Sequence, residues 1–282
     1  MVLGSMVSFL TILAHAGGDR DVPAPANEKV FKKCQLIKKE VLAESRDRGE
    51  PIVKLVFAAP GKELVDVNTA LRQVILVRAN GVTRKYSPPS EPCRPDGTFE
   101  LIVRVYESGN VSRFLGSLQV GETADMCWPF PSPLIPDRRN AGTHVGLVAY
   151  GVGITELFRV AINELGDPAV QEVLLLYSTR TAEDQQVLGR ELEELALKEK
   201  RFRLLRAVSR ERVPGMLHGR ADASMLREVF LPWATGPDRS NARFLPAGSK
   251  DMILLAHKCL VDLGFDADQS KLIRDNRPLA SS

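Results

Sequence analysis

Arginine, tyrosine and serine lie within four residues of one another in the segment Arg84-Lys85-Tyr86-Ser87. A flavin site needs a cation for the pyrophosphate, a flat apolar surface for the ring and a small hydroxyl near the ring edge. Alternate residues of a strand share a face, so Arg84, Tyr86 and Ser87 supply these three groups in order. The alternative is a surface arginine beside a tyrosine that packs on the sheet, and four residues alone leave both interpretations open.

A glycine turn, Gly109-Asn110-Val111-Ser112, follows a predicted strand that ends at Val105-Tyr106. The turn leads into a predicted helix over residues 112–118, which places backbone N–H groups and the Ser112 hydroxyl at a helix N-terminus. Such a terminus binds phosphate readily. Taken alone, the segment is more simply explained as a serine cap after a tight turn.

A second glycine segment, Gly151-Val152-Gly153-Ile154-Thr155, lies between a predicted strand and a predicted helix. Glycines at this point let a nucleotide approach the backbone, and the helix dipole favours its phosphate. The segment is not a full GxGxxG fingerprint. An ordinary strand-to-helix turn is the alternative.

The elements that position the first two segments are short β-like runs between Phe31 and about Ala124. Each run is rich in Val, Ile and Leu and bounded by Gly, Pro or charged residues: 51–58, 71–79 and 99–107. Their spacing predicts an antiparallel β-barrel. Residues 128–140 contain four prolines and two arginines, which indicates a linker. We therefore expect a tail over 1–28, a barrel domain over 29–137 and an α/β domain over 138–282.

The second half alternates strands with helices, which predicts a parallel sheet. Strands are expected at 144–150, 172–178, 202–209 and 242–246. Thr181 is expected to cap a helix whose buried stripe includes Val187, Leu188 and Leu192, and Ser249 to cap the last helix. Ligands of such sheets bind outside the carboxyl ends of the strands.

Composition excludes several classes of protein. A net charge of +3 over 282 residues, without a long basic face, argues against nucleic-acid binding. The four cysteines and four histidines are scattered, so we expect no metal, and reduced thiols in an intracellular, reducing compartment: the cytoplasm or an organelle membrane surface. The apolar segment 6–16 is too short to span a bilayer and predicts a loose tail, with weak membrane contact as the alternative.

In order and spacing, these pieces resemble the ferredoxin–NADP reductase superfamily, and within it the cytochrome b5 reductase branch. The family's flavin motif R-x-Y-[ST] reads RKYS here, its G-x-x-S turn reads GNVS, and its G-x-G-I-T reads GVGIT. The likeness extends over about residues 30–275. It implies a two-domain fold, with an antiparallel FAD-binding β-barrel followed by a parallel α/β nucleotide-binding domain.

The resemblance also implies roles for individual residues. Arg84 would hold the FAD pyrophosphate, Tyr86 would lie against the flavin ring, and Ser87 would reach its redox-active nitrogen. Ser87 and Thr155 would be the catalytic residues. The rest of the FAD site would be lined by Arg104, Tyr106, Gly109, Val111 and Ser112. The floor where nicotinamide meets flavin would be formed by Gly151, Gly153 and Thr155, and Gly248 would be a further cofactor-binding residue.

Several positions depart from the family pattern. Tyr150 stands where another glycine is common, and Glu156 replaces the proline after GIT. The family's C-G-P-P-x-M motif reads PAGSKDM at Pro246–Met252, so its cysteine is absent. Three interpretations follow: an FAD-dependent NAD(P)H oxidoreductase that serves a one-electron protein or quinone acceptor, a degenerate member that binds FAD structurally or acts as an interaction module, and an α/β protein without flavin.

The loop after the second strand of the α/β domain bears on the choice of nucleotide. Glu183 and Asp184 would repel the 2′-phosphate of NADPH, and Arg180 would attract it. Both acids could instead simply favour a helix N-terminus. Two acids against one arginine, together with the resemblance to an NADH-using branch, predict that NADH is preferred over NADPH.

Overall fold

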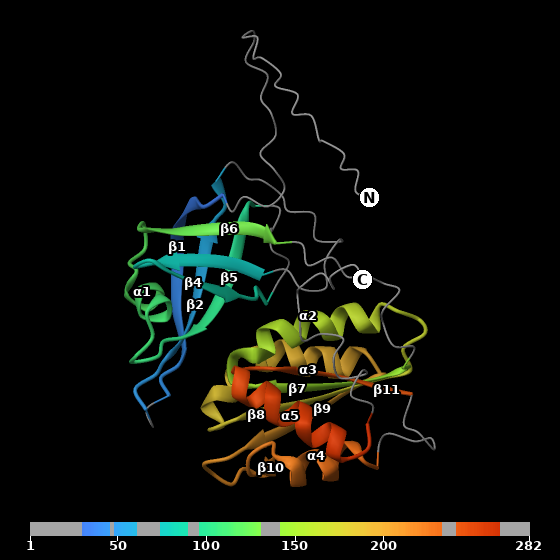
Figure 1. Cartoon of the computed structure of the whole chain (residues 1–282). Helices are drawn as coiled ribbons and strands as arrows, with labels where there is room; N and C mark the ends of the chain where they lie inside the picture. Colours follow the sequence, from blue (N-terminus) through green and yellow to red (C-terminus); the bar gives the residue numbers. More distant parts are fainter. Residues whose placement is uncertain are drawn as a thin grey trace, which may run out of the picture. The chain divides into compact units, whose positions relative to one another are not determined.

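The computed structural model describes residues 30–45, 48–60, 74–89, 96–130, 142–232 and 241–265. The chain divides into two units, Met1–Val30 and Phe31–Ser282, and both sheets lie in the second unit (Figure 1). The expected N-terminal tail lies outside the described residues. The first three residues of the expected linker, 128–130, end the last strand of the first sheet. The remaining linker residues, 131–140, lie outside the described residues.

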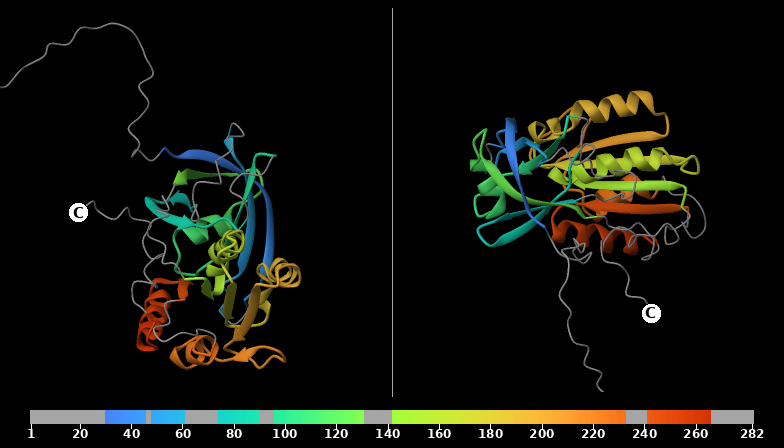
Figure 2. Two further views of the ribbon diagram at one scale, coloured as in Figure 1. Left: turned by 90° about the vertical axis from the view of Figure 1, so that its right-hand side faces the viewer. Right: turned by 90° about the horizontal axis from the view of Figure 1, so that it is seen from above.

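The first sheet contains six strands, each paired antiparallel with its neighbours in the order β4-β3-β6-β1-β2-β5. Its strands, which curve strongly in Figure 2, are β1 (Lys32–Ala43), β2 (Ile52–Ala58), β3 (Val74–Ala79), β4 (Val82–Tyr86), β5 (Thr98–Arg104) and β6 (Thr123–Phe130). Helix α1 (Val111–Ser117) contacts β3, β4 and β5. The helix therefore lies against both outer strands of the sheet, as the predicted barrel requires.

A tight hairpin sets the register of β4. Asn80 and Gly81, which join β3 to β4, both have positive φ (50° and 74°), as an Asn-Gly hairpin turn requires. The register places Arg84 opposite Val77 and Tyr86 opposite Ile75. Because a shift of one residue would move both side chains to the other face, this turn positions the predicted flavin motif.

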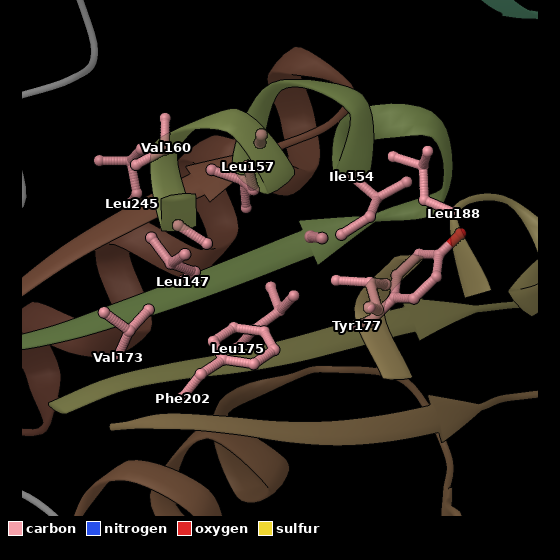
Figure 3. Packing of buried hydrophobic residues seen from close by; sticks show 14 of the residues in the cluster. Leu147, Ile154, Leu157, Val160, Val173, Leu175, Tyr177, Leu188, Phe202 and Leu245 are labelled. Atoms are coloured by element: carbon pink, nitrogen blue, oxygen red, sulfur yellow. The ribbon is translucent and has the colours of Figure 1, made fainter. Parts of the chain in front are cut away.

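The second sheet contains five parallel strands in the order β10-β9-β8-β7-β11. They are β7 (His144–Tyr150), β8 (Glu172–Thr179), β9 (Phe202–Val208), β10 (Leu217–His218) and β11 (Ala242–Ala247). Helices α2 (Ile154–Leu165) and α3 (Gly189–Lys198) cover one face, and α4 (Ala223–Phe230) and α5 (Lys250–Asp262) cover the other (Figure 1). Figure 3 shows Leu147, Leu157 and Val160 packed between α2 and the sheet.

The predicted start of the helix near Thr181 is wrong. Residues 183–186 form a short 3₁₀ helix, and Leu188 then adopts a left-handed conformation with φ 57°, so that α3 begins only at Gly189. Thr181 precedes Ala182, the N-cap residue of this short helix, and its hydroxyl accepts the Asp184 N–H at 3.3 Å. The Ser249 cap is confirmed, because its hydroxyl accepts the N–H of Met252.

Gly146 in β7 lies under the aromatic rings of Phe230 and Phe244, which belong to the core between the parallel sheet and helices α4 and α5. A Cβ at this position would overlap the Phe244 ring and lie 3.2 Å from Phe230. Overpacking of this kind costs about 1–3 kcal/mol. We therefore expect Gly146→Ala to lower the free energy of unfolding by that amount in urea titrations.

Gly189→Ala is the matched control. It stands at the start of α3, where the nearest atom to an added Cβ is 3.8 Å away. Since alanine favours a helix over glycine, this variant should be as stable as the wild type or slightly more so. Equal destabilisation by both substitutions would contradict the packing described for Gly146.

Candidate functional site

Arg84 and Tyr86 share a face of β4, as their spacing predicts. Arg84 is exposed, and its Nη1 donates to the Thr83 carbonyl at 3.0 Å. Tyr86 is half-buried, and burial raises the pKa of its phenol to about 12, with Tyr106 adding to the shift and Arg84 opposing it. Arg84 and Tyr106 therefore each lie within electrostatic range of Tyr86, and the Tyr86 phenol is neutral at physiological pH.

The glycine turn before α1 is packed closely. A Cβ at Gly109 would overlap the Ser112 hydroxyl oxygen, so only glycine fits there. The Ser112 hydroxyl accepts the Tyr106 N–H at 3.3 Å, and no side chain caps the helix at Asn110. Helix α1 contacts β4, and the Val111 side chain at its first position is buried in the barrel core. Val111 can reach a ligand only through its backbone.

The order of the parallel strands identifies where a nucleotide would bind. From β7 the chain proceeds to β8 and β9 on one side, and it returns to β11 on the other, so the strand order reverses between β7 and β11. Ligands of open α/β sheets bind at this reversal, outside the carboxyl ends of the strands. Gly151 follows β7 with φ 54°, and a Cβ built on it would meet no atom within 4 Å. The backbone at Gly151 is therefore open to a ligand.

Gly153 and Gly248 have a different reason to be glycine. A Cβ on Gly153 would lie 2.6 Å from the Ala247 carbonyl carbon and 2.8 Å from the Gly248 nitrogen. Gly248 has φ 152°, and a Cβ there would lie 2.7 Å from the Cβ of Tyr150. These two glycines allow the turn after β11 to pack on the turn after β7, which brings both predicted nucleotide segments together.

The hydroxyls of Thr155 and Tyr150 are bound within the protein. Thr155 is buried and donates to the Val152 carbonyl at 3.0 Å. Tyr150 belongs to the core cluster shared with α4 and α5, and its hydroxyl donates to the Ala221 carbonyl at 2.8 Å. Burial raises the pKa of the Tyr150 phenol. Tyr150 therefore fills the core instead of covering Gly151.

Arg104 is held in a cluster of protein groups. Its Nη2 lies 2.7 Å from the Asp184 carboxylate, and its Nη1 donates to the Ser45 hydroxyl at 3.0 Å and the Glu50 carbonyl at 3.2 Å. The Ser45 hydroxyl in turn donates to Asp184 at 2.7 Å. Arg104 and Asp184 are 5% and 1% exposed. We call these four groups the Arg104 cluster; in it the guanidinium joins β5 to the segment after β8.

The structure joins two residues that were predicted to contact different ligands. Arg104, predicted to line the FAD site, pairs with Asp184, predicted to repel the 2′-phosphate of NADPH. Ser45, which the sequence-based site did not include, adopts φ 47° and is almost fully buried. Strained non-glycine residues are held in place only by their surroundings. Nothing in the sequence near Ser45 indicates this role, because its partners lie 59 and 139 residues away.

Two further findings concern the described residues. Across the ranges that the structure describes, no three His, Cys, Asp or Glu side chains lie together as metal ligands would. Among the helices placed in those ranges, none has the length and apolar character needed to cross a membrane.

Comparison with known proteins identifies the barrel. Residues 34–130 match the oxidoreductase FAD-binding domain family. The match covers the antiparallel sheet and α1, so the first domain is similar to the FAD-binding domains of that family. Its matched region contains Arg84, Tyr86 and the whole of α1.

Distant relatives extend over most of the chain. The NADH-cytochrome b5 reductase 1 of Laccaria bicolor is 27% identical over 248 residues, which cover 86% of this chain and 76% of that protein. The NADH-cytochrome b5 reductase 1 of Eremothecium gossypii is 25% identical over 92% of this chain and 90% of its own length. The NADH-cytochrome b5 reductase 2 of Aspergillus fumigatus is 31% identical, but the match spans 55% of this chain and 48% of the relative.

Solved structures share the two-domain fold. The CS-b5R domains of human Ncb5or match with a TM-score of 0.69 and 22% identity, over 88% of this chain and 70% of that chain. The ferredoxin NADP+ reductase of Neisseria gonorrhoeae, which was solved with FAD and NADP, matches with a TM-score of 0.63 and 20% identity, over 84% of this chain and 93% of that one. The predicted fold, an antiparallel barrel followed by a parallel α/β domain, is confirmed.

The Arg104 cluster predicts a large loss of stability when one charge is removed. Asp184→Asn leaves the Arg104 guanidinium buried without a counter-ion, which costs about 3–5 kcal/mol. We expect a correspondingly lower urea midpoint. The double variant Arg104→Met/Asp184→Leu should lose less, because it buries no uncompensated charge.

Asp125→Asn is the control, since Asp125 pairs with Lys33 and Arg78 at the surface. Such exposed pairs contribute less than about 1 kcal/mol. If Asp184→Asn proved as mild as Asp125→Asn, the buried ion pair would be refuted.

Proposed function

We propose that this protein is an FAD-dependent oxidoreductase that passes electrons from NADH or NADPH through its flavin to a one-electron protein or quinone acceptor. The proposal rests on the presence of two candidate sites in one chain, one for FAD and one for a nicotinamide nucleotide. Arg84 and Tyr86 lie beside α1 in a domain of an FAD-binding family. Gly151 is open at the strand reversal of a parallel sheet.

The residues of the barrel fit FAD. The exposed Arg84 guanidinium is available for a charge-assisted bond to the pyrophosphate, and α1, which contacts β4, has no side-chain cap on its first N–H groups. The neutral Tyr86 offers its ring face to the flavin, and Ser87 follows at the end of β4. When bound, FAD supplies the chemistry: it accepts a hydride and releases electrons singly.

The α/β domain supplies the surface for the nicotinamide. The open backbone at Gly151 admits a flat ring, and Gly153 holds the turn after β11 against it. The hydroxyl of Thr155 fixes the backbone at Val152, so Thr155 acts by positioning the turn. In this arrangement the protein orients the reactants and supplies no acid–base pair.

A second candidate function is favoured by the turn after β11. Ala247 and Ser249 replace the cysteine and first proline of the family motif, and Gly248 is packed on Tyr150 instead of being open. A protein with this turn could keep FAD for structural reasons, or serve as an interaction module, without efficient turnover of NAD(P)H.

Anaerobic titration of the purified protein with NADH separates the two functions. The proposed oxidoreductase should be isolated with flavin and should lose its oxidised flavin absorbance as NADH is added. Retention of an oxidised flavin spectrum with either NADH or NADPH would support the structural role. Protein that contains no flavin, and takes up none when FAD is supplied, would contradict both.

Arg84→Ala tests the flavin site itself. A charge-assisted phosphate contact contributes about 1.5–3 kcal/mol, which is roughly tenfold to a hundredfold in affinity. We expect the variant to lose flavin during dilute gel filtration while keeping its urea midpoint. Lys85→Ala is the control, because Lys85 is equally exposed on the opposite face of β4. Equal flavin retention by the two variants would remove Arg84 from the site.

A further inference from the structure

The hydrophobic core beside α2 and α3 continues into the barrel domain. Its buried members include Ala43 at the end of β1, Ile52 at the start of β2 and Ile102 in β5. In the α/β domain the same cluster contains Ile154 and Tyr177, which are fully buried. Separating the two domains would expose this shared apolar surface to water, which is unfavourable. The two sheets are therefore joined by one core at this junction.

The Arg104 cluster adjoins this shared core. Arg104 pairs with Ile52 in the register of β5 and β2. The Tyr177 hydroxyl donates to the Asp184 carbonyl at 3.1 Å. The Asp184 carboxylate is held by Arg104 and Ser45, which belong to the barrel domain. Asp184 therefore binds both domains, one through its side chain and the other through its backbone.

The hairpin between β1 and β2 also binds the loop after β8 at two other residues. The Glu44 N–H donates to the Glu183 carboxylate at 2.7 Å. The Glu50 carboxylate accepts Arg180 Nη1 at 3.2 Å. Together with the Arg104 cluster, these contacts form one set of bonds along the loop from residue 180 to residue 184.

The turn after β9 holds the same loop. The Arg180 carbonyl accepts the Arg210 N–H at 2.9 Å. The Glu211 carboxylate accepts the Ala182 N–H at 2.5 Å. The loop is thus bonded to two neighbouring strand ends of the parallel sheet, and a contact that fixes it to the barrel fixes that sheet as well.

The turn that begins at Gly151 lies at the same junction. It contacts β8 and also β5, the strand that ends at Arg104. Ile154, which follows the turn, belongs to the shared core, and Figure 3 shows it near Leu188 and Tyr177. The open backbone at Gly151 is therefore set against a strand of the barrel domain.

We propose that Ser45 and Asp184 are positioning residues for electron transfer: with Arg104, they hold the turn at Gly151 in place beside the barrel, so that a nicotinamide bound there meets the flavin without a domain movement. This inference rests on the proposed function. Hydride transfer requires reacting atoms about 3–3.5 Å apart, and a displacement of about 1 Å can slow it about 100-fold. The Ser45 hydroxyl binds Arg104 and Asp184, so Ser45 acts through these two residues.

Two variants loosen the junction to different degrees. Ser45→Ala removes the hydroxyl that Arg104 and Asp184 share but keeps their ion pair. Arg104→Met/Asp184→Leu removes the pair and leaves no charge buried without a partner. The double variant therefore tests the junction without the folding defect expected of Asp184→Asn.

The first measurement requires no turnover. Amide hydrogen exchange of the full chain as purified reports local opening of the segments 40–45 and 180–184. We expect both segments to lose protection, slightly in Ser45→Ala and strongly in the double variant. Exchange of α4, which packs on the other face of the parallel sheet, should match the wild type.

The second measurement separates binding from chemistry. Anaerobic stopped-flow mixing of the flavin-loaded protein with NADH and, separately, with NADPH gives the limiting rate of flavin reduction at saturation. We expect this rate to fall about tenfold to hundredfold in the double variant and by less in Ser45→Ala, because position and not occupancy is changed. Flavin reduction by dithionite, which needs no nicotinamide, should match the wild type.

Two controls isolate the junction. Glu44→Gln changes an exposed side chain of the same hairpin but keeps the backbone bond to Glu183, so both measurements should match the wild type. Phe230→Leu lowers stability elsewhere, because the Phe230 ring packs on Phe244 in the core beside α4 and α5. Its lower urea midpoint should not be accompanied by slower flavin reduction.

Wild-type reduction rates in the double variant, together with faster exchange of the loop, would overturn the inference and leave the proposed function intact. Equal slowing by Phe230→Leu would also overturn it, because general stability would then account for the rates. Unchanged exchange in the double variant would show that the Arg104 cluster does not hold the loop, and would overturn it as well. If the wild-type protein contains FAD that neither NADH nor NADPH reduces, the proposed function fails and the inference fails with it.

Discussion

The buried ion pair between Arg104 and Asp184 joins residues that lie 80 positions apart. Two charges removed from water destabilise a fold unless their remaining hydrogen-bonding groups are satisfied. Here the Ser45 hydroxyl binds both partners, and the Glu50 carbonyl takes a second guanidinium nitrogen. Arg104 ends β5, whose chain continues to Tyr106 and α1, and Asp184 precedes α3. The segment between β5 and α1 and the loop after β8 are therefore fixed to a common anchor.

Local patterns determined how far the sequence could be interpreted. The strand over 144–150 and the Ser249 cap were predictable because hydrophobic runs and capping residues act within a few positions. The shared face of Arg84 and Tyr86 followed from strand alternation in the same way. The break at Leu188 was not predictable, because the apolar spacing continues through it while the backbone reverses to φ 57°. Tertiary packing overrides helical periodicity at that residue.

Gly151, Gly153 and Gly248 illustrate a second limit on what the sequence alone can predict. A sequence shows only that a glycine is present, and the likeness to a nucleotide-binding turn suggests one role for all of them. In the structure, the space beside Gly151 is open. The space beside Gly153 and Gly248 is filled, because the turns after β7 and β11 pack closely against each other there. Only Gly151 is therefore directly available to a ligand. Tyr150, in place of a family glycine, is accommodated because its side chain enters the core beside Ala221.

The loop after β8 shows why counting charges along a sequence misassigns them. Two acids and one arginine between positions 180 and 184 suggest a net negative surface for the nucleotide. A buried or paired charge, however, exerts little field on a ligand, because its partner cancels it at short range. Asp184 is cancelled by Arg104 and Arg180 by Glu50. Glu183 keeps its charge, because the Glu44 N–H that it accepts is neutral. The charges of this loop therefore hold the two domains together as ion pairs and hydrogen bonds, and their number along the sequence does not give the potential at a ligand.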